Sequence, residues 1–305
     1  MAGAIYKSPI RFALMATVVI LIGTVVTMFY PMATDEMHPK TEKLKPYTVL
    51  QLAGRDIYQR EGCVNCHTQT VRPLKTEVMR YGAYSKAGEF AYDRPFLWGS
   101  KRTGPDLARI GKKYPDQWHY RHFDDPIQFH PKSNMPVYGW MKTDALDGES
   151  LKAHMNALGF PYTEEEISAL SDKNELDALV AYLQVIGVSV RLPKKTIVAD
   201  TKTNPFAGNA EAIAKGQELY VEHCEDCHGE EGEGDIGPSF RDSIFLHVEG
   251  DVGDDIYFQL VSTGLEEGAE LVGRKAKEEM PGFADEISAD DIWRAIAYIR
   301  TLKEQ

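Results

Sequence analysis

The chain contains very little cysteine and, over its last third, very little positive charge. Its four cysteines all lie within two pentapeptides, so no thiol is left for a disulfide elsewhere. Residues 206–305 contain 24 acidic and 8 basic residues, a balance of −16 that the remainder offsets by +4 to give the net charge of −12. This charge argues against nucleic acid as a partner and favours a soluble acidic domain or a basic protein partner.

Long apolar runs are scarce too, with one exception near the N-terminus. Residues 12–30 form a 19-residue run that only four residues interrupt: Thr17, Gly23, Thr24 and Thr27. At about 1.5 Å per residue, a helix of this length crosses the hydrocarbon layer of a bilayer. A cleaved signal peptide is the competing interpretation, but the run is long for one and no Ala-x-Ala site follows. We expect residues 1–32 to be an uncleaved anchor in the lipid bilayer.

The two cysteine-containing pentapeptides have one form: Cys63-Val64-Asn65-Cys66-His67 and Cys224-Glu225-Asp226-Cys227-His228. Cys-x-x-Cys-His is the attachment pattern of haem c, in which two thiols bond the vinyl groups and the histidine binds the iron. A zinc site or a redox dithiol is the alternative for a Cys-x-x-Cys pair. Neither explains the adjacent histidine or the surroundings that both copies share. The sequence therefore predicts two covalently bound haem c groups.

Both pentapeptides follow a helical pattern, expected over residues 47–61 and 209–223. Each pattern carries a glycine four residues before a tyrosine, and the two pairs are Gly54 with Tyr58 and Gly216 with Tyr220. Residues at this spacing share one face of a helix, and glycine allows a second helix to approach closely. We expect such a contact in both copies.

Each copy is also expected to end in a helix, over residues 163–186 and 288–302, opened by the capping residues Thr163 and Ser288. The chain is thus an internal repeat, mainly α: a single transmembrane helix followed by two cytochrome c-type haem domains. The predicted divisions are a first domain over 33–190, a linker over 191–205 and a second, acidic domain over 206–305.

On one side of each predicted haem, the iron ligand is expected to be a histidine: His67 in the first domain and His228 in the second. The second ring nitrogen of each needs a carbonyl partner that fixes the tautomer. Gly-Pro loops that contain Pro105 and Pro238 follow the two histidines and are expected to supply that carbonyl.

For the sixth ligand, the second domain offers Met280, which lies in a Met-Pro-Gly-Phe loop before the last helix. A thioether ligand raises the reduction potential and suits electron transfer. In the first domain we choose Met135, which also precedes a proline, with Met141 as the runner-up. The other candidates are Met79, Met155, His119, His122, His130 and His154 in the first domain, and His223 and His247 in the second.

The first domain also carries a distinctive set of motifs. They are Gln69-Thr70-Val71-Arg72-Pro73, Glu77-Val78-Met79-Arg80-Tyr81-Gly82, Trp98-Gly99-Ser100-Lys101-Arg102-Thr103-Gly104-Pro105-Asp106-Leu107, Trp118-His119 and Ser133-Asn134-Met135-Pro136. With the anchor, this set resembles the mono-haem, membrane-anchored cytochrome c subunit (FixO or CcoO type) of cbb3-type haem-copper oxidases, over residues 1 to about 190. The second domain resembles small class I cytochromes c and the haem domains of the companion di-haem subunit. The family subunit usually stops after one haem domain, so the fused second domain is a departure.

The resemblance implies that His67 and Met135 are axial ligands and that electrons pass to a separate haem-copper catalytic subunit. We expect a di-haem relay from a cytochrome c donor, through the second domain, to that subunit. The chain would not be catalytic by itself, and its haem domains would lie on the periplasmic face of the bacterial inner membrane. Arg72 and Arg102 are candidates to pair with haem propionates, although solvated surface arginine is the plain alternative.

Two other functions remain open at this point. One is a free-standing membrane-anchored di-haem cytochrome that feeds another reductase. The other is a di-haem peroxidase, which needs an open iron site and is disfavoured by the methionines available to both haems. A gas sensor is less favoured still, because we find no output domain in the sequence.

Overall fold

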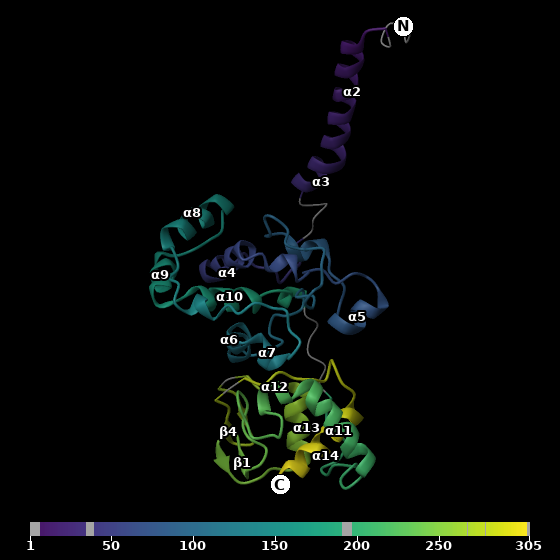
Figure 1. Ribbon diagram of the computed structural model, residues 1–305, viewed down its shortest axis with the longest axis vertical. Helices are drawn as coiled ribbons and strands as arrows, with labels where there is room; N and C mark the ends of the chain where they lie inside the picture. Colours follow the sequence, from purple (N-terminus) through teal and green to yellow (C-terminus); the bar gives the residue numbers. More distant parts are fainter. Residues whose placement is uncertain (1–6, 35–39, 191–196, 267, 278, 304–305) are drawn as a thin grey trace.

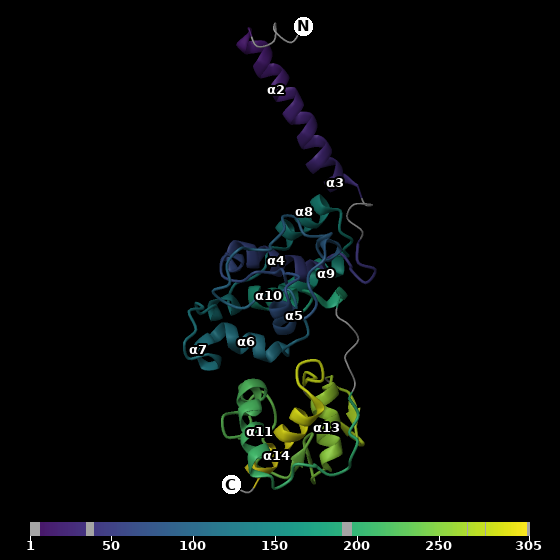
Figure 2. The same ribbon diagram turned by 90° about the vertical axis from the view of Figure 1, so that its right-hand side faces the viewer.

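The computed structural model describes residues 7–34, 40–190, 197–266, 268–277 and 279–303. An N-terminal helix is followed by two helical domains, one after the other along the longest axis of the molecule (Figure 1, Figure 2). Parts of the predicted anchor, of the polar stretch after it and of the linker lie outside the described residues, at 1–6, 35–39 and 191–196.

The N-terminal helix has three continuous parts: α2 (Pro9–Thr24), the π-helical turn η1 (Val25–Phe29) and α3 (Tyr30–Ala33). It is the one helix among the described residues that is long and apolar enough to cross a membrane, and none of it is buried in the rest of the chain. The Thr24 and Thr27 hydroxyls donate to the carbonyls of Ile20 and Gly23, at 2.9 and 2.7 Å. Such bonds satisfy polar groups within the helix itself, as a bilayer interior requires.

The first domain consists of helices and short 3₁₀ turns: α4 (Val49–Arg60), η2 (Cys63–Asn65), α5 (Lys75–Tyr81), η3 (Ala87–Phe90), α6 (Asp116–Asp124), α7 (Pro126–Phe129), η4 (Gly139–Lys142), α8 (Gly148–Leu158), α9 (Glu164–Ser168), η5 (Ala169–Asp172), α10 (Glu175–Leu183) and η6 (Val188–Val190). Its core is one apolar cluster in which α4 packs along α10. Helices α6 and α7 lie on the side of this domain that faces the second domain (Figure 1, Figure 2).

The second domain has its own core around α11 and α14. Its elements are α11 (Ala210–His223), α12 (Glu225–His228), β1 (Ile244–Phe245), β2 (Val248–Glu249), α13 (Asp254–Thr263), β3 (Glu270–Leu271), β4 (Arg274–Lys275) and α14 (Ala289–Leu302). The strands form two short antiparallel pairs, with Phe245 opposite Val248 in one and Leu271 opposite Arg274 in the other. The fold is thus mainly α, as predicted.

The two glycines four residues before a tyrosine occupy the same kind of position in both domains. A Cβ added at Gly54 would lie 1.8 Å from the carbonyl oxygen of Ala178 on α10, and one at Gly216 would lie 2.1 Å from that of Arg294 on α14. Only glycine fits where a helix passes so close to another backbone. The predicted close approach of two helices is therefore confirmed in both copies.

One predicted helix is wrong. Residues 163–186 form three pieces (α9, η5 and α10), although the Thr163 cap is present as expected. The backbone is extended at Lys173, and the Asn174 side chain accepts a hydrogen bond from the Asp177 N–H at 2.9 Å while the Asp177 carboxylate accepts one from the Asn174 N–H. A reciprocal cap of this kind starts a new helix. The other three predicted helices agree with α4, α11 and α14 to within two residues.

Candidate functional site

The first pentapeptide lies at the end of α4. Gly62 adopts a left-handed conformation (φ 70°) that ends the helix, and Cys63 opens the turn η2. His67 follows, and its Nδ1 donates to the carbonyl oxygen of Pro105 at 2.9 Å. The predicted carbonyl contact is present. It leaves Nε2 of His67 as the nitrogen available to a metal.

The second pentapeptide repeats this arrangement on α11 and α12. His228 Nδ1 donates to the Pro238 carbonyl at 2.8 Å, and the ring of Phe240 stacks on the imidazole at 4.2 Å. The Tyr220 hydroxyl donates to the Gly229 carbonyl at 2.6 Å, which ties the helix to the residue after the histidine. The Phe240 stack was not anticipated from the sequence.

The glycine of each Gly-Pro loop lies flat against the histidine ring. A Cβ at Gly104 would come within 2.2 Å of Cε1 of His67, and one at Gly237 within 2.5 Å of Cε1 of His228. Each loop can therefore clamp its imidazole only with glycine at this position. The clamp fixes the plane of the ring as well as its tautomer.

The thiols do not resemble an activated dithiol. Burial raises the pKa of Cys63, Cys224 and Cys227 to about 12, which keeps these groups protonated at neutral pH. A redox dithiol or zinc ligand needs the thiolate, which a basic environment usually favours. The side chain of Cys66 is exposed, and all four cysteines are unpaired. The protonated thiols disfavour a redox dithiol. Among the described residues no group of three or more His, Cys, Asp or Glu side chains could hold a metal ion, which disfavours zinc.

A cavity of about 760 Å³, in the range typical of ligand sites, lies beside the second pentapeptide, and residues of both domains line it. Cys224, Cys227, His228 and Met280 all line it, together with apolar side chains from α13 and α14. Met280 is held in place by two backbone hydrogen bonds with Leu265, each 2.8 Å long. The structure thus places the predicted thioether ligand and the histidine around one cavity.

The two rival histidines of the second domain also line this cavity. The imidazole of His223 packs against Phe283, and its Nδ1 lies 3.9 Å from the Glu286 carboxylate. His247 adopts a left-handed backbone conformation (φ 62°) in the turn between β1 and β2. The choice of Met280 over these two histidines stays a prediction.

Burial distinguishes the methionines of the first domain. Met141 and Met155 are 0% exposed and belong to the apolar core, whereas Met79 is 77% exposed. Met135 is half-buried at the edge of the core, and its N–H donates to the Ser133 hydroxyl at 3.2 Å. Met135 is thus neither locked in the core nor fully solvated. This favours Met135 as the sixth ligand, which stays a prediction.

Among the first-domain histidines, His154 pairs with the Asp56 carboxylate at 2.8 Å and His130 is exposed. His119 and His122 lie on α6, where burial lowers their pKa to about 3 and about 4. His67 lowers the pKa of His122 further, by a smaller amount than burial does. Neither the Nε2 of His119 nor the Nδ1 of His122 has a hydrogen-bond partner within the described ranges.

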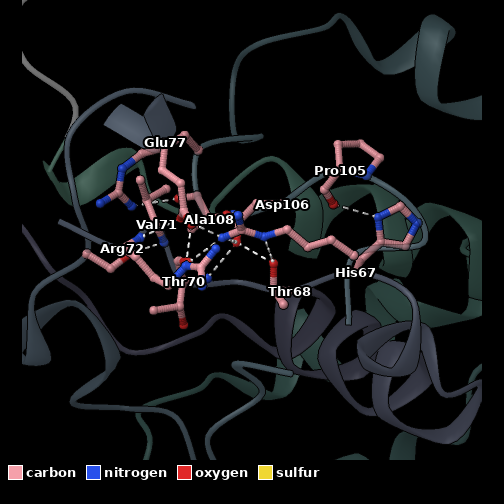
Figure 3. A network of polar contacts seen from close by, with 12 residues as sticks. His67, Thr68, Thr70, Val71, Arg72, Glu77, Pro105, Asp106 and Ala108 are labelled. Atoms are coloured by element: carbon pink, nitrogen blue, oxygen red, sulfur yellow. Dashed lines mark hydrogen bonds and ion pairs between the residues drawn. The ribbon is translucent and has the colours of Figure 1, made fainter. Parts of the chain in front are cut away.

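Arg102, a predicted propionate partner, is held by protein groups. Its guanidinium donates to the Thr68 hydroxyl at 2.6 Å, the Thr70 carbonyl at 2.9 Å and the Glu77 carboxylate at 2.8 Å, and it pairs with Asp106 at 3.2 Å. Arg72 also contacts Glu77, because its backbone N–H and its guanidinium both donate to that carboxylate (Figure 3). Contacts of either arginine with haem stay predictions.

Asp106 connects this network to the clamp on His67. Its carboxylate accepts from the Thr68 hydroxyl at 2.6 Å and from the N–H groups of Thr70 and Ala108, each at 2.9 Å (Figure 3). Because Asp106 follows Pro105 directly, the network fixes the loop whose carbonyl orients His67. The motifs around Thr70 and Arg102 were noted in the sequence, but this shared role was not.

Both sites are suited to haem c by their own geometry. Each presents two neighbouring thiols and an imidazole with Nε2 free. In the second, a cavity adds a thioether. In the first, unpaired buried polar atoms such as His122 Nδ1 would each cost about 1–3 kcal/mol if left without a partner. A group with polar and apolar edges would relieve that cost.

Comparison with known families agrees with this geometry. A family model described as cytochrome c oxidase, mono-haem subunit/FixO, matches residues 3–175, which is more than half of the chain. The chain belongs to the FixO family. A second model, described as cytochrome c oxidase, cbb3-type, subunit III, matches residues 211–299. This FixO protein therefore has an additional C-terminal cytochrome c domain, as the sequence predicted, and haem c is the cofactor that both domains imply.

Other comparisons add little. No curated protein matches the chain. Among solved structures, cytochrome cL from Methylophaga aminisulfidivorans is 23% identical, with a TM-score of 0.26. The match covers 33% of this chain and 60% of that one, so the FixO chain spans less than two thirds of the relative's length.

Proposed function

We propose that this chain is a membrane-anchored, di-haem c electron-transfer subunit of a cbb3-type cytochrome c oxidase. Electrons pass from a cytochrome c donor to the second site, then to the first, and from there to the haem-copper catalytic subunit that reduces oxygen. The α2–α3 helix anchors the chain in the bacterial inner membrane, and both haem domains lie on its periplasmic face. The chain itself is a relay and not a catalyst.

The observation that carries this proposal is the repeated histidine clamp. In both domains the histidine donates Nδ1–H to a Gly-Pro loop, at 2.9 and 2.8 Å, and presents Nε2. When bound, haem c supplies a one-electron iron couple at each site. The chain's own contribution is to hold each imidazole in one tautomer and plane, so little rearrangement accompanies a change of charge.

Methionine supports a relay over oxygen or peroxide chemistry. Met280 shares the cavity with His228, and Met135 lies half-buried in the first domain. A thioether from either residue would favour electron transfer by a bound haem over oxygen or peroxide chemistry. A di-haem peroxidase would need one iron without such a ligand.

The experiment is purification of the native membrane complex, followed by intact-mass measurement of this chain. We expect a haem-copper subunit to co-purify and the chain mass to exceed that of the polypeptide by two haem groups. Replacing both Cys224 and Cys227 with Ala should remove one haem and leave the other, which provides the matched control.

Other results would replace the proposal with its rivals. A di-haem chain that purifies without a haem-copper subunit would be a free-standing cytochrome that feeds another reductase. A high-spin haem together with peroxide turnover by the isolated chain would indicate a peroxidase.

A further inference from the structure

Three aromatic side chains stack on one another at the start of α6 and along it. Trp118 and His122 are four residues apart and share one face of the helix, and Tyr114 lies just before the helix begins at Asp116. The rings of Tyr114 and Trp118 are 4.0 Å apart and inclined by 14°, and those of Trp118 and His122 are 4.6 Å apart and inclined by 9°. We call these three side chains the α6 column. Phe129 of α7 packs on it, with its ring 5.3 Å from that of Trp118.

One end of the α6 column reaches the second haem site. Tyr114 lines the same cavity as Cys227 and His228. Trp118 lies near Asp226 of the second pentapeptide, although its indole N–H makes no well-aligned hydrogen bond among the described residues. Thus a first-domain side chain forms part of the wall of the second-domain site.

The other end approaches the first haem site. The ring of Phe123, next to His122, lies 6.1 Å from that of Tyr138, and the Phe123 carbonyl accepts a hydrogen bond from the Tyr138 N–H at 2.8 Å. Tyr138 lies three residues after the predicted ligand Met135, so His122 lies beside the loop of the first site. Its Nδ1 is buried and has no partner among the described residues. In both views α6 lies on the face of the first domain next to the second (Figure 1, Figure 2).

Ion pairs on the same segment hold the two domains together. Lys113, directly before Tyr114, pairs with Glu286 at 3.2 Å, and Arg121, directly before His122, pairs with Asp235. These contacts place basic residues of the first domain against the acidic second domain, on either side of Trp118. The α6 column is therefore held at the domain boundary by opposite charges.

We propose that the α6 column is the path by which an electron crosses from the second haem site to the first. This inference rests on the proposed di-haem relay and adds the residues that connect its two sites. One electron leaves the second site, which is oxidised, and arrives at the first, which is reduced, and no bond is made or broken. The packed, near-parallel rings leave no empty space along this path. A loosely packed domain boundary would place a gap between the two sites.

The test uses the full chain with both haem groups attached, in detergent. Trp118→Leu removes the central ring, Trp118→Phe keeps an aromatic ring, and Trp140→Leu is the control, since Trp140 is an exposed tryptophan of the same domain. Two quantities are measured: the rate constant of transfer between the sites after photochemical reduction, and the yield of a carbodiimide cross-link between Lys113 and Glu286. Redox titration of each variant checks that the driving force is unchanged.

We expect Trp118→Leu to slow the transfer severalfold while the cross-link and both potentials stay as in the original chain. Trp118→Phe should restore most of the rate, and Trp140→Leu should leave it unchanged. An unchanged rate in Trp118→Leu, with the cross-link retained, overturns the α6 column. Absence of the cross-link from the original chain overturns it as well, because the boundary would then not be formed.

If Trp118→Leu itself loses the cross-link, the comparison moves to His122→Leu, at the far end of the column from the cavity. A severalfold slower transfer in that variant supports the proposal, and an unchanged rate overturns it. A chain with a single haem, or without any transfer between sites, removes the proposed relay altogether. That result is distinct from one in which transfer between the two sites occurs but its rate does not depend on Trp118.

Discussion

The two candidate haem sites share one clamp but differ in what surrounds it. His228 is 6% exposed and lines a cavity together with Met280. Two backbone hydrogen bonds with Leu265 hold Met280 in place. His67 is more exposed, and Met135 has a single hydrogen bond to the nearby Ser133. The first site has the Arg102 network behind its clamp. The repeat thus fixes how the histidine is held, and each domain sets the rest of the environment independently.

This difference is compatible with the proposed relay, in which the two sites exchange electrons with different partners. The second site buries its histidine and is closed in part by the first domain, since Tyr81 and Tyr114 also line the cavity. A partly open site leaves space for other protein surfaces, which a subunit that passes electrons onward requires. The predictions below test how far the two sites are alike and where they differ.

The largest expected effect comes from the sixth ligands. Met280→His and Met135→His should each lower the reduction potential of one site by an amount on the order of 0.1–0.3 V, within the roughly 0.8 V range that axial ligands span in haem proteins. The reason is that a thioether favours reduced iron more than an imidazole does. Redox titration of the two haems checks this.

Met141→Leu is the matched control, because Met141 is fully buried in the first core. It should leave both potentials unchanged. If Met135→His leaves the first potential unchanged, Met135 is not the ligand, and His122 becomes the next candidate. The same outcome for Met280→His would direct attention to His223 and His247.

The next largest effect concerns the glycines where helices cross. Gly54→Ala and Gly216→Ala place a methyl group 1.8 and 2.1 Å from a backbone oxygen, so each helix pair must separate. Overpacking of this kind costs about 1–3 kcal/mol or more. Each kcal/mol lowers the melting temperature by roughly 4–8 °C in a domain of 60–100 residues and by less in a larger one. Calorimetry should show one transition shifted by each variant.

The control here is Gly148→Ala, at which a Cβ would meet its nearest atom at 3.5 Å. It should shift neither transition by more than a small amount. If Gly216→Ala lowered both transitions equally, the two cores would unfold as one unit, contrary to the separate clusters seen in the structure.

A smaller effect distinguishes the first site by its acid sensitivity. Arg102, and then Arg72, hold the pKa of Glu77 at about 2, against an ordinary value of 4.5. A carboxylate whose pKa is lowered by folding stabilises the fold above its unfolded pKa and loses that contribution as it is protonated. The first domain should therefore lose stability as the pH falls from about 4.5 to about 2, which melting curves over that range will show.

Glu77→Gln should weaken this dependence and lower the melting temperature at neutral pH. Glu165→Gln, at an exposed position of α9, is the control and should keep the original pH profile. An identical acid profile in Glu77→Gln would show that other carboxylates cause the loss.

The features that the sequence predicted are short-range or periodic. The pentapeptides, the Gly-Pro loops and the Gly54 and Gly216 contacts depend on residue types at fixed local spacing. The break before α10 had a local signal as well, since Asn174 and Asp177 have the spacing of a capping box. That signal lay inside an apolar pattern that looked continuous.

Contacts between distant segments did not have such a signal. Asp106 meets Thr68 across 38 residues, and Arg121 meets Asp235 across 114. The α6 column illustrates the limit, because its spacing of four is ordinary for a helix. The spacing indicates a path between the sites only once α6 is seen to lie between the two domains.

The smallest expected effect tests the charge difference between the domains. Lys113 and Glu286 are each about one third exposed, so their ion pair is expected to contribute about 0.2–1 kcal/mol at most. Lys113→Gln should lower the melting temperature of the second domain slightly at low ionic strength, and salt should remove the difference because it screens exposed charges. Lys215→Gln, which breaks a pair with Glu218 inside α11, is the control of similar size. If Lys113→Gln lowers the melting temperature in this salt-dependent way and Lys215→Gln does not, part of the second domain's acidity acts inward on the first domain. If the two variants behave alike, that acidity remains available to a basic electron donor.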